Sequence, residues 1–144
     1  MIITLPNDFQ VGLRPAHLGD MNFIYNSWMK QVRTHQPFDK MSPEDFKAHK
    51  VKVIDPILES CNVIMAHDPE SENVDWGYVV FNGDVCHFVY VKGDFRDKGF
   101  GKALMSAAFE DFQKKTVYCT HLAQSFKKLR EPWKLCWDPY RCSI

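Results

Sequence analysis

Two glycines inside a basic segment, Gly99 and Gly101, are the residues whose type and spacing point most directly to chemistry. They follow an apolar, strand-like run and precede a run with helical periodicity, so they lie at a strand-to-helix turn. Glycine lets backbone N–H groups point outward without a side chain in the way. The positive end of the helix and the cations Arg96, Lys98 and Lys102 add charge. The sequence therefore predicts an anion site, most simply one for phosphate or pyrophosphate.

Two phosphate-binding motifs do not fit this segment. A Walker loop ending at Gly101-Lys102 would need glycine where Arg96 stands and serine or threonine where Ala103 stands. The dinucleotide fingerprint G-x-G-x-x-G would need its third glycine at Leu104, and no acid ends a following strand about 20 residues on. The anion site is therefore of neither kind.

The segment does fit the [RQ]-x-x-G-x-[GA] signature of the GNAT acetyltransferase superfamily, which it resembles from Arg96 to Gly101. The stretch V-x-G-D-F-R-D-K-G-F-G-K-A-L-M, residues 91–105, resembles the strand, bulge and helix of that family. The opening L-R-P-A-x-x-x-D, from Leu13 to Asp20, resembles its first strand and the start of its first helix. The spacings F-I-Y-N-S-W and V-Y-V-K-x-x-F-R look most like small phage-encoded members. The resemblance covers most of the chain.

The resemblance implies a role for each side of the turn. Backbone N–H groups of the turn would wrap the pyrophosphate of acetyl-CoA. The residues concerned are Arg96, Asp97, Lys98, Gly99, Phe100, Gly101 and Lys102. The preceding strand would pair with the pantetheine arm through the backbone of Val89, Tyr90 and Val91. This strand would splay from the next one and open a V-shaped cleft, where a backbone N–H would polarise the thioester carbonyl. The alternative is an ordinary glycine-bearing turn with surface lysines.

A base and an acid are needed for transfer from a thioester to an amine. A lysine-like amine has a pKa near ~10.4 and must lose a proton, and the departing thiolate benefits from receiving one. His87 is the leading candidate for the base, because it interrupts an apolar strand that would line the acyl site, and His121 is the second. The alternative for His87 is a histidine at the edge of the core, satisfied by hydrogen bonds.

The acid that the resemblance would supply is missing. GNAT enzymes commonly carry a tyrosine where this chain has Phe126. Ser125, Tyr118 and Tyr140 are candidates to replace its hydroxyl, and the sequence does not rank them. The other histidines and two aspartates are expected at the surface or in turns: His17, His35, His49, His67, Asp75 and Asp84.

The remaining segments predict the elements that position these groups. Strand-like runs are Val11–Arg14, Cys61–Ala66, Trp76–Phe81, Val85–Val91 and Val117–Thr120. Helical periodicity follows an N-cap at Asp20, an N-cap at Ser42 and the glycine turn, and Pro56 should kink or split the second helix. Residues 67–73 and 82–84 are expected to be turns. The order predicts one domain over residues 1–144, of α/β (α+β) class. We expect a GNAT-like mixed, mostly antiparallel sheet with helices on both faces.

Aromatic residues could line a slot for the acceptor, although each is more often part of a core. They are Tyr25, Trp28, Trp76, Trp133, Trp137 and Tyr140. The stretch after Thr120 is short for the family and could form just one strand and a turn near Trp137 to Tyr140. A second copy of the chain, in a homodimer, could supply a missing edge strand.

Composition limits the partners. The 18 basic and 18 acidic residues cancel, which argues against nucleic acid and anionic membranes. No apolar run approaches the ~18 residues of a membrane span, and the first residues do not resemble a signal peptide, so we expect a cytoplasmic protein. The five cysteines include no C-x-x-C pair, so we expect reduced, buried cysteines and no metal.

The sequence favours two candidate functions, from different classes. The first is an acetyl-CoA-dependent N-acetyltransferase that acts on a primary amine of a small molecule, peptide or protein. The second is a catalytically weak or inactive GNAT-fold protein that binds CoA, a partner protein or both, which the departure at Phe126 favours. An unrelated small α/β domain is the third interpretation.

Overall fold

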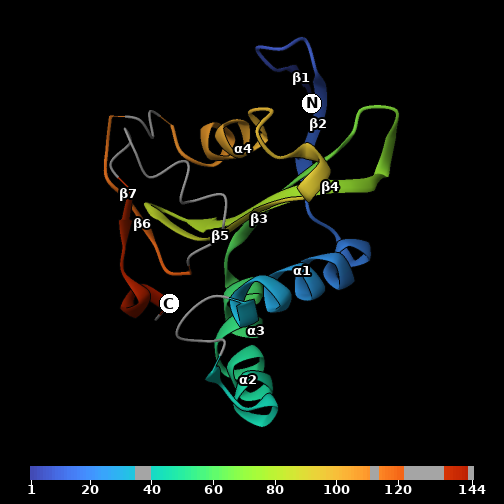
Figure 1. Cartoon of the computed structure of the whole chain (residues 1–144). Helices are drawn as coiled ribbons and strands as arrows, with labels where there is room; N and C mark the ends of the chain where they lie inside the picture. The colour runs from blue at the N-terminus through green and yellow to red at the C-terminus, as the bar shows by residue number, and fades with distance from the viewer. Residues whose placement is uncertain (35–39, 111–113, 122–134, 143–144) are drawn as a thin grey trace.

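The computed structural model describes residues 1–34, 40–110, 114–121 and 135–142 (Figure 1). These residues form a seven-stranded sheet whose strands lie side by side in the order of the sequence. The strands are β1 (Ile2–Thr4), β2 (Gln10–Pro15), β3 (Asn62–Asp68), β4 (Ser71–Asn82), β5 (Val85–Val91), β6 (Val117–Cys119) and β7 (Leu135–Trp137). Pairing is antiparallel from β1 to β5 and parallel from β5 through β6 to β7. The predicted mixed, mostly antiparallel sheet is therefore confirmed.

Helices cover both faces of the sheet. The helices are α1 (Met21–Thr34), α2 (Pro43–His49), α3 (Asp55–Ser60) and α4 (Phe100–Ala108), with short turns η1 (Leu18–Asp20), η3 (Lys50–Ile54), η4 (Gly93–Phe95) and η5 (Pro139–Cys142). Figure 1 shows α4 on one side of the sheet and α1 on the other, with α2 and α3 on the α1 side. No helix in the described ranges is long and apolar enough to cross a membrane.

The predicted helix starts are correct for α2 and wrong for α1. Ser42 caps α2 by accepting the N–H of Asp45, and Pro56 lies in the first turn of a separate helix, α3, after the π-helical turn η3. Asp20 is not an N-cap, because η1 precedes α1 and moves the cap back to His17. The carboxylate of Asp20 instead accepts the backbone N–H of His17 at 2.9 Å, as the second half of a capping box.

The β3–β4 hairpin is longer than the sequence indicated. Residues 67–73 were expected to form a polar turn, but Asp68 already pairs with Ser71, so only Pro69 and Glu70 connect the strands. The prediction was wrong because the start of β4 is exposed and carries polar residues, while its backbone pairing continues. Strand β1 was not predicted, because its three residues are too few to show the alternation of apolar and polar residues that indicates a strand.

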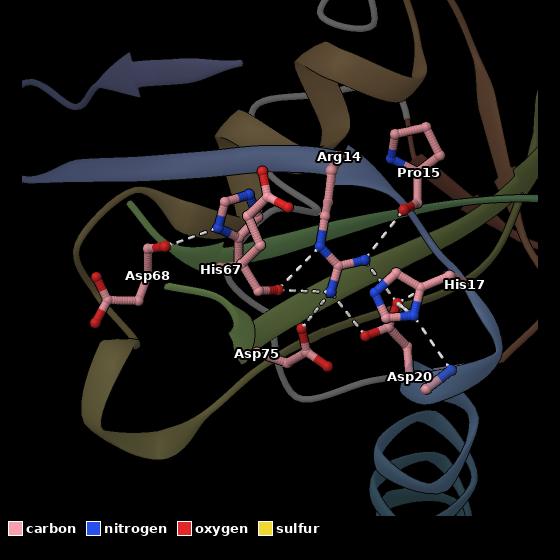
Figure 2. A network of polar contacts seen from close by, with 9 residues as sticks. Arg14, Pro15, His17, Asp20, His67, Asp68 and Asp75 are labelled. Atoms are coloured by element: carbon pink, nitrogen blue, oxygen red, sulfur yellow. Dashed lines mark hydrogen bonds and ion pairs between the residues drawn. The ribbon is translucent and has the colours of Figure 1, made fainter. Parts of the chain in front are cut away.

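A cluster of charges fastens the start of α1 to the sheet (Figure 2). The guanidinium of Arg14 on β2 donates two hydrogen bonds to Asp20, at 2.7 and 2.8 Å, and one to Asp75 on β4, at 3.1 Å. It also donates to the carbonyl of Glu72 at 2.8 and 3.0 Å. Asp75 was expected in a turn; it lies within β4 because the strand begins four residues earlier, at Ser71.

The core on the α1 side is aromatic. The indole of Trp28 stacks on Phe88 with ring centroids 4.9 Å apart, and both side chains are fully buried. The hydroxyl of Tyr78 contacts Ser27 at 2.8 Å and donates to the carbonyl of Ile24 at 3.1 Å, so the buried oxygen is satisfied. These contacts fix α1 against the centre of the sheet.

Candidate functional site

The glycine turn has a backbone that presents N–H groups. Between η4 and α4, Asp97 has a φ of 66° and Gly99 a φ of 91°, both left-handed. Gly99 occupies the N-cap position of α4, and no side chain caps it. The first N–H groups of a helix have no partner within the helix, so those at the start of α4 are available to an anion. The predicted anion site therefore has the backbone that it needs.

The three cations of the turn have different surroundings. The Nε of Arg96 donates to the carbonyl of Val91 at 2.9 Å, which joins the turn to the end of β5. The Nζ of Lys98 lies 5.2 Å from the ring centroid of Phe9. Lys102 is exposed on the first turn of α4. Arg96 thus shapes the turn, and Lys102 is placed to attract an anion to it.

Beside this turn lies a groove of about 400 Å³, between the β1–β2 hairpin and the outer side of α4. Gly99 and Lys102 line one part of it, and apolar side chains such as Ile3, Leu13 and Ala103 line the rest. The turn is therefore open to a concave surface on that side.

Among the described residues, no strand pairs with one half of β5 on the edge that faces away from β4. The N–H of Lys92 donates to the carbonyl of Trp76 on β4, at 2.8 Å. Alternate residues of an antiparallel strand point their backbone groups to opposite edges, so Tyr90 also faces β4, while Val89 and Val91 face the other edge. The bond from Arg96 to the carbonyl of Val91 on that edge agrees with this assignment.

Strands β5 and β6 separate part-way along β5. Their register contains two pairs, Val85 with Tyr118 and Cys86 with Cys119. Beyond Cys86 a bulge at the next residue, His87, shifts the pairing with β4, so that Phe88 pairs with Val80 and Cys86 with Phe81. A bulge bends its strand. The described residues thus show the splay that the sequence led us to expect, with His87 at its apex.

Polar side chains join in a chain at this apex. The Nδ1 of His87 lies 3.0 Å from the hydroxyl of Thr120, and the same hydroxyl lies 3.0 Å from the Nδ1 of His121. The Nε2 of His121 lies 3.2 Å from the Nε2 of His49, on α2. Four side chains from β5, the end of β6 and α2 therefore form one continuous path, which we call the histidine chain.

Burial keeps the histidine chain uncharged. It lowers the pKa of His87 to about 4 and, with the charges of His49 and His87 in addition, lowers the pKa of His121 to about 3. Burial also lowers the pKa of His49. Neutral imidazole carries one N–H donor and one acceptor nitrogen, so it can receive a proton at one nitrogen and release one from the other.

Comparisons with known proteins identify the fold. No family model and no curated protein matches the sequence. Among solved structures, a histone acetyltransferase HPA2 and related acetyltransferase from Corynebacterium glutamicum matches with a TM-score of 0.55 and 16% identity, over 83% of this chain and 81% of that one. Apo-form YjaB from Escherichia coli matches with a TM-score of 0.51 and 16% identity, over 68% of this chain and 63% of that one.

The chain has the GNAT fold. A GNAT superfamily phosphinothricin acetyltransferase from Sinorhizobium meliloti, in complex with AcCoA, matches less well, with a TM-score of 0.49, 19% identity and coverage of 68% of this chain and 57% of that one. The chain spans less than two thirds of the length of YjaB and of this enzyme. The predicted recognition of the GNAT fold is confirmed, and the likeness to small phage-encoded members stays a prediction.

The GNAT fold brings the predicted cofactor residues to one place and leaves the catalytic candidates apart. The segment from Val89 to Lys102 is continuous through the open edge of β5 and the start of α4. Tyr140 lies on η5 and is 88% exposed, and no contact between described residues joins it to His87. Ser125 lies outside the described residues, as does Phe126.

Two histidines were placed wrongly by sequence reasoning. His49 was expected at the surface, but it is half-buried and contacts His121. His67 was expected in a turn, but it is buried on β3, with its ring against the backbone of Gly12. Neither had a local signal: His49 acquires its role from a residue 72 positions away, and His67 needs the absence of a side chain on the neighbouring strand.

The aromatic residues expected to line an acceptor slot do not gather in one place. Trp28 is in the core, whereas Trp76 stacks on Phe95 near the start of α4, with ring centroids 4.4 Å apart. Trp137 donates its indole N–H to the carbonyl of Thr120 at 3.3 Å, just after β6. Trp133 lies outside the described residues. The predicted slot is therefore wrong as a set, because these residues belong to different faces and layers.

The cysteines in the described part of the chain differ in burial. Cys86 and Cys119 are buried, as expected, whereas Cys136 is exposed and Cys61 is half-buried. No group of three or more His, Cys, Asp or Glu side chains in the described residues is arranged to hold a metal ion.

Proposed function

We propose that this protein is an acetyl-CoA-dependent N-acetyltransferase that acts on a primary amine. The observation that carries the proposal is the open edge of β5 at Val89 and Val91, which continues directly into the uncapped N-terminus of α4. An extended amide-bearing arm can pair with a strand edge, and a pyrophosphate can bind helix N–H groups. Acetyl-CoA offers both groups in one molecule. In this proposal the chain acts as one domain, residues 1–144, in the cytoplasm and without a metal.

The residues of β5 and of the glycine turn fit the acyl donor. The N–H groups at the start of α4 would hold the pyrophosphate, with Gly99 and Gly101 keeping side chains away and Lys102 adding charge. The backbone groups of Val89 and Val91 would hold the pantetheine arm. Acetyl-CoA would supply the thioester. These groups hold and orient the donor, which is a large part of what such a reaction needs.

The reaction balances without a further reactant. The amine nitrogen bonds to the acetyl carbon, the carbon–sulfur bond breaks, and the sulfur leaves with its electron pair. An amine that arrives neutral gives up one proton, and the thiolate can take it, yielding amide and CoA thiol. An amine that arrives as ammonium releases one more proton, because its pKa is near ~10.4. A base in the cleft is therefore useful, and His87, at the apex, is the proposed one.

The test is release of free CoA thiol from acetyl-CoA in the presence of a panel of primary amines. We expect turnover by the unaltered chain and about a 100-fold or larger loss of affinity for acetyl-CoA in Gly101→Val, whose branched side chain would stand where phosphate must approach. Gly93→Val is the matched control, because a Cβ at Gly93 meets no atom within 4 Å and that backbone is not left-handed. Equal affinities of the two variants for acetyl-CoA would contradict the assignment of the anion site.

Binding of acetyl-CoA with no transfer to any amine would instead favour the second function, a GNAT-fold protein that acts by binding CoA or a partner protein. Tyr140 on η5 is one of several large apolar side chains that are exposed among the described residues, and a protein partner could cover such side chains. Isothermal titration with acetyl-CoA, run beside the thiol assay, separates the two functions.

A further inference from the structure

The guanidinium of Arg14 contacts more oxygen atoms than it has hydrogens to donate (Figure 2). Its five N–H groups are shared among six contacts with oxygen. The excess lies at Nη2, which has two hydrogens and three oxygens around it. These are Oδ1 of Asp20 at 2.8 Å, the carbonyl of Glu72 at 2.8 Å and Oδ1 of Asp75 at 3.1 Å. The longest contact is the one to Asp75, so Arg14 by itself does not fully satisfy this carboxyl group.

The carboxyl groups of Asp20 and Asp75 are also hydrogen-bonded to each other. Ionised carboxylates only accept hydrogen bonds, so this contact needs a hydrogen on one of the two groups. Both are largely buried, with side-chain exposures of 2% and 10%, and two negative charges side by side in such a place repel each other. One proton on the pair leaves a single negative charge opposite the single positive charge of Arg14.

We propose that Asp20 and Asp75 share one proton, and that this proton makes the Arg14 network a pH-sensitive latch that fastens the start of α1 to β4. The carboxyl of Asp75 donates the hydrogen, and the carboxylate of Asp20 accepts it. The latch is independent of acetyl transfer, because it concerns only how a helix is attached to the sheet.

Asp20 is the member of the pair that stays ionised. Its carboxylate accepts two hydrogen bonds from Arg14 and one from the backbone N–H of His17. Although burial opposes them, these hydrogen bonds hold the pKa of Asp20 well below its ordinary value. Burial, followed by the hydrogen bond to Asp20 and its charge, raises the pKa of Asp75 to about 7. Below that pH the proton of the pair therefore lies on Asp75.

Charged and titratable groups surround the two carboxyl groups. They are Arg14 on β2, His17 before η1, His67 on β3, Glu72 on β4 and Lys92 after β5. Arg14 and Lys92 favour the ionised form of Asp75, but burial and the charge of Asp20 outweigh them. The exposed ring of His17 has its Nδ1 3.6 Å from Asp20. The first turn of α1 contributes no acid, so the shared proton is the means by which a second carboxyl group is accommodated.

The latch holds the part of α1 that packs beside the proposed donor edge of β5. The ring of Phe23, in the first turn of α1, contacts the ring of Tyr90, with centroids 5.9 Å apart. Tyr90 stands between Val89 and Val91 on β5. When the start of α1 separates from β4, Asp75 returns to water and releases its proton. Opening therefore becomes up to tenfold more favourable per pH unit between the ordinary pKa of 3.8 and about 7.

Hydrogen exchange at the start of α1 tests the latch. In the unaltered chain, we expect the protection of the backbone N–H groups of residues 22–26, corrected for the intrinsic rate, to fall up to tenfold per pH unit from pH 4 to 7. Asp75→Asn replaces the shared proton by an amide hydrogen that does not titrate, so its protection should stay nearly constant. Glu72→Gln changes an exposed side chain on the same strand and is the matched control, which should follow the unaltered chain.

The same pH dependence in Asp75→Asn and in the unaltered chain would overturn the latch. Carbon-detected NMR of the carboxyl groups gives a second reading that needs no variant. The latch predicts that the carboxyl carbon of Asp75 titrates near pH 7, while Asp20 stays ionised from pH 4 to 8. Titration of both carboxyl groups near pH 4 would show that they share no proton and would overturn the proposal.

Discussion

Two polar networks are buried against the sheet, and they manage charge in opposite ways. The Arg14 network at the start of α1 is charged: one guanidinium faces Asp20 and Asp75, with side-chain exposure of 12%, 2% and 10% (Figure 2). The histidine chain at the apex of β5 and β6 holds His87 and His121, which are equally buried, in the neutral form. The first ties three segments together by paired charges, and the second is held by hydrogen bonds between neutral groups.

This difference distinguishes the Arg14 network, which stabilises the fold, from the histidine chain, which can take part in a reaction. Burying a charge is costly unless it is paired, so every member of the Arg14 network depends on the others. The histidine chain is neutral and hydrogen-bonded, and its member His87 is the proposed base. We therefore expect changes in the Arg14 network to alter stability, and changes in the histidine chain to alter rate.

Arg14→Ala is expected to have the largest effect. It leaves the buried carboxylate of Asp20 without its bidentate partner, which should lower the free energy of unfolding by about 3–5 kcal/mol. Arg141→Ala is the control, because Arg141 pairs with Asp138 at the surface and should cost less than about 1 kcal/mol. Urea unfolding of both variants measures the difference. Similar losses of unfolding free energy in the two variants would contradict the structural role of the Arg14 network.

His87→Ala is expected to lower kcat about 100-fold or more, which corresponds to about 2.7 kcal/mol in the barrier, and to leave the binding of acetyl-CoA nearly unchanged. His17→Ala loses an imidazole at an exposed cap and should retain kcat. Steady-state kinetics with the best amine of the panel gives both parameters. A loss confined to KM, or a change only in unfolding, would return His87 to a structural role.

The smallest expected effect is a change in the pH dependence of stability. Burial, followed by the hydrogen bond and charge of Asp20, raises the pKa of Asp75 from 3.8 to about 7, against the charges of Arg14 and Lys92. The folded chain then holds a proton that the unfolded chain releases between these values, so this group loses stabilising effect as the pH rises through that window. Asp75→Asn should remove that fall, as unfolding at several pH values from 4 to 8 would show.

The histidine chain should act in the opposite direction. The pKa of His87 is lowered from 6.5 to about 4, so its stabilising contribution is present above pH 6.5 and is lost as the pH falls toward 4. A stability profile of His87→Gln that lacks this loss supports the assignment. Parallel profiles in Asp75→Asn and His87→Gln would contradict the contrast between the networks.

The sequence predicted the glycine turn well because its chemistry is local. Gly99 takes a left-handed φ that glycine adopts readily, and the change from strand to helical period is visible within the segment from Val85 to Ala108. The splay and the fold class followed from the resemblance that this turn carries, whereas the parallel pairing of β6 was not predicted. Residue types and their spacing were therefore enough to predict the part of the site that is made of backbone.

The side-chain networks could not be predicted in the same way. His49 and His121 are 72 positions apart, and nothing near either one indicates the contact. Asp75 has the composition of a turn around it, and only the continued pairing of β4 places its carboxyl beside Arg14. Their contacts depend on where whole elements pack, whereas residue patterns report the elements one at a time.

The most direct test of the account is thermal unfolding with and without acetyl-CoA. At 100 times Kd, one binding site adds about 2.7 kcal/mol and should raise Tm by roughly 5–10 °C in a domain of this size. The account predicts that shift for the unaltered chain and for Gly93→Val, its absence with ATP or NAD, and its loss in Gly101→Val. No shift of the unaltered chain at millimolar acetyl-CoA would contradict the assignment of the glycine turn and the edge of β5 as the acetyl-CoA site.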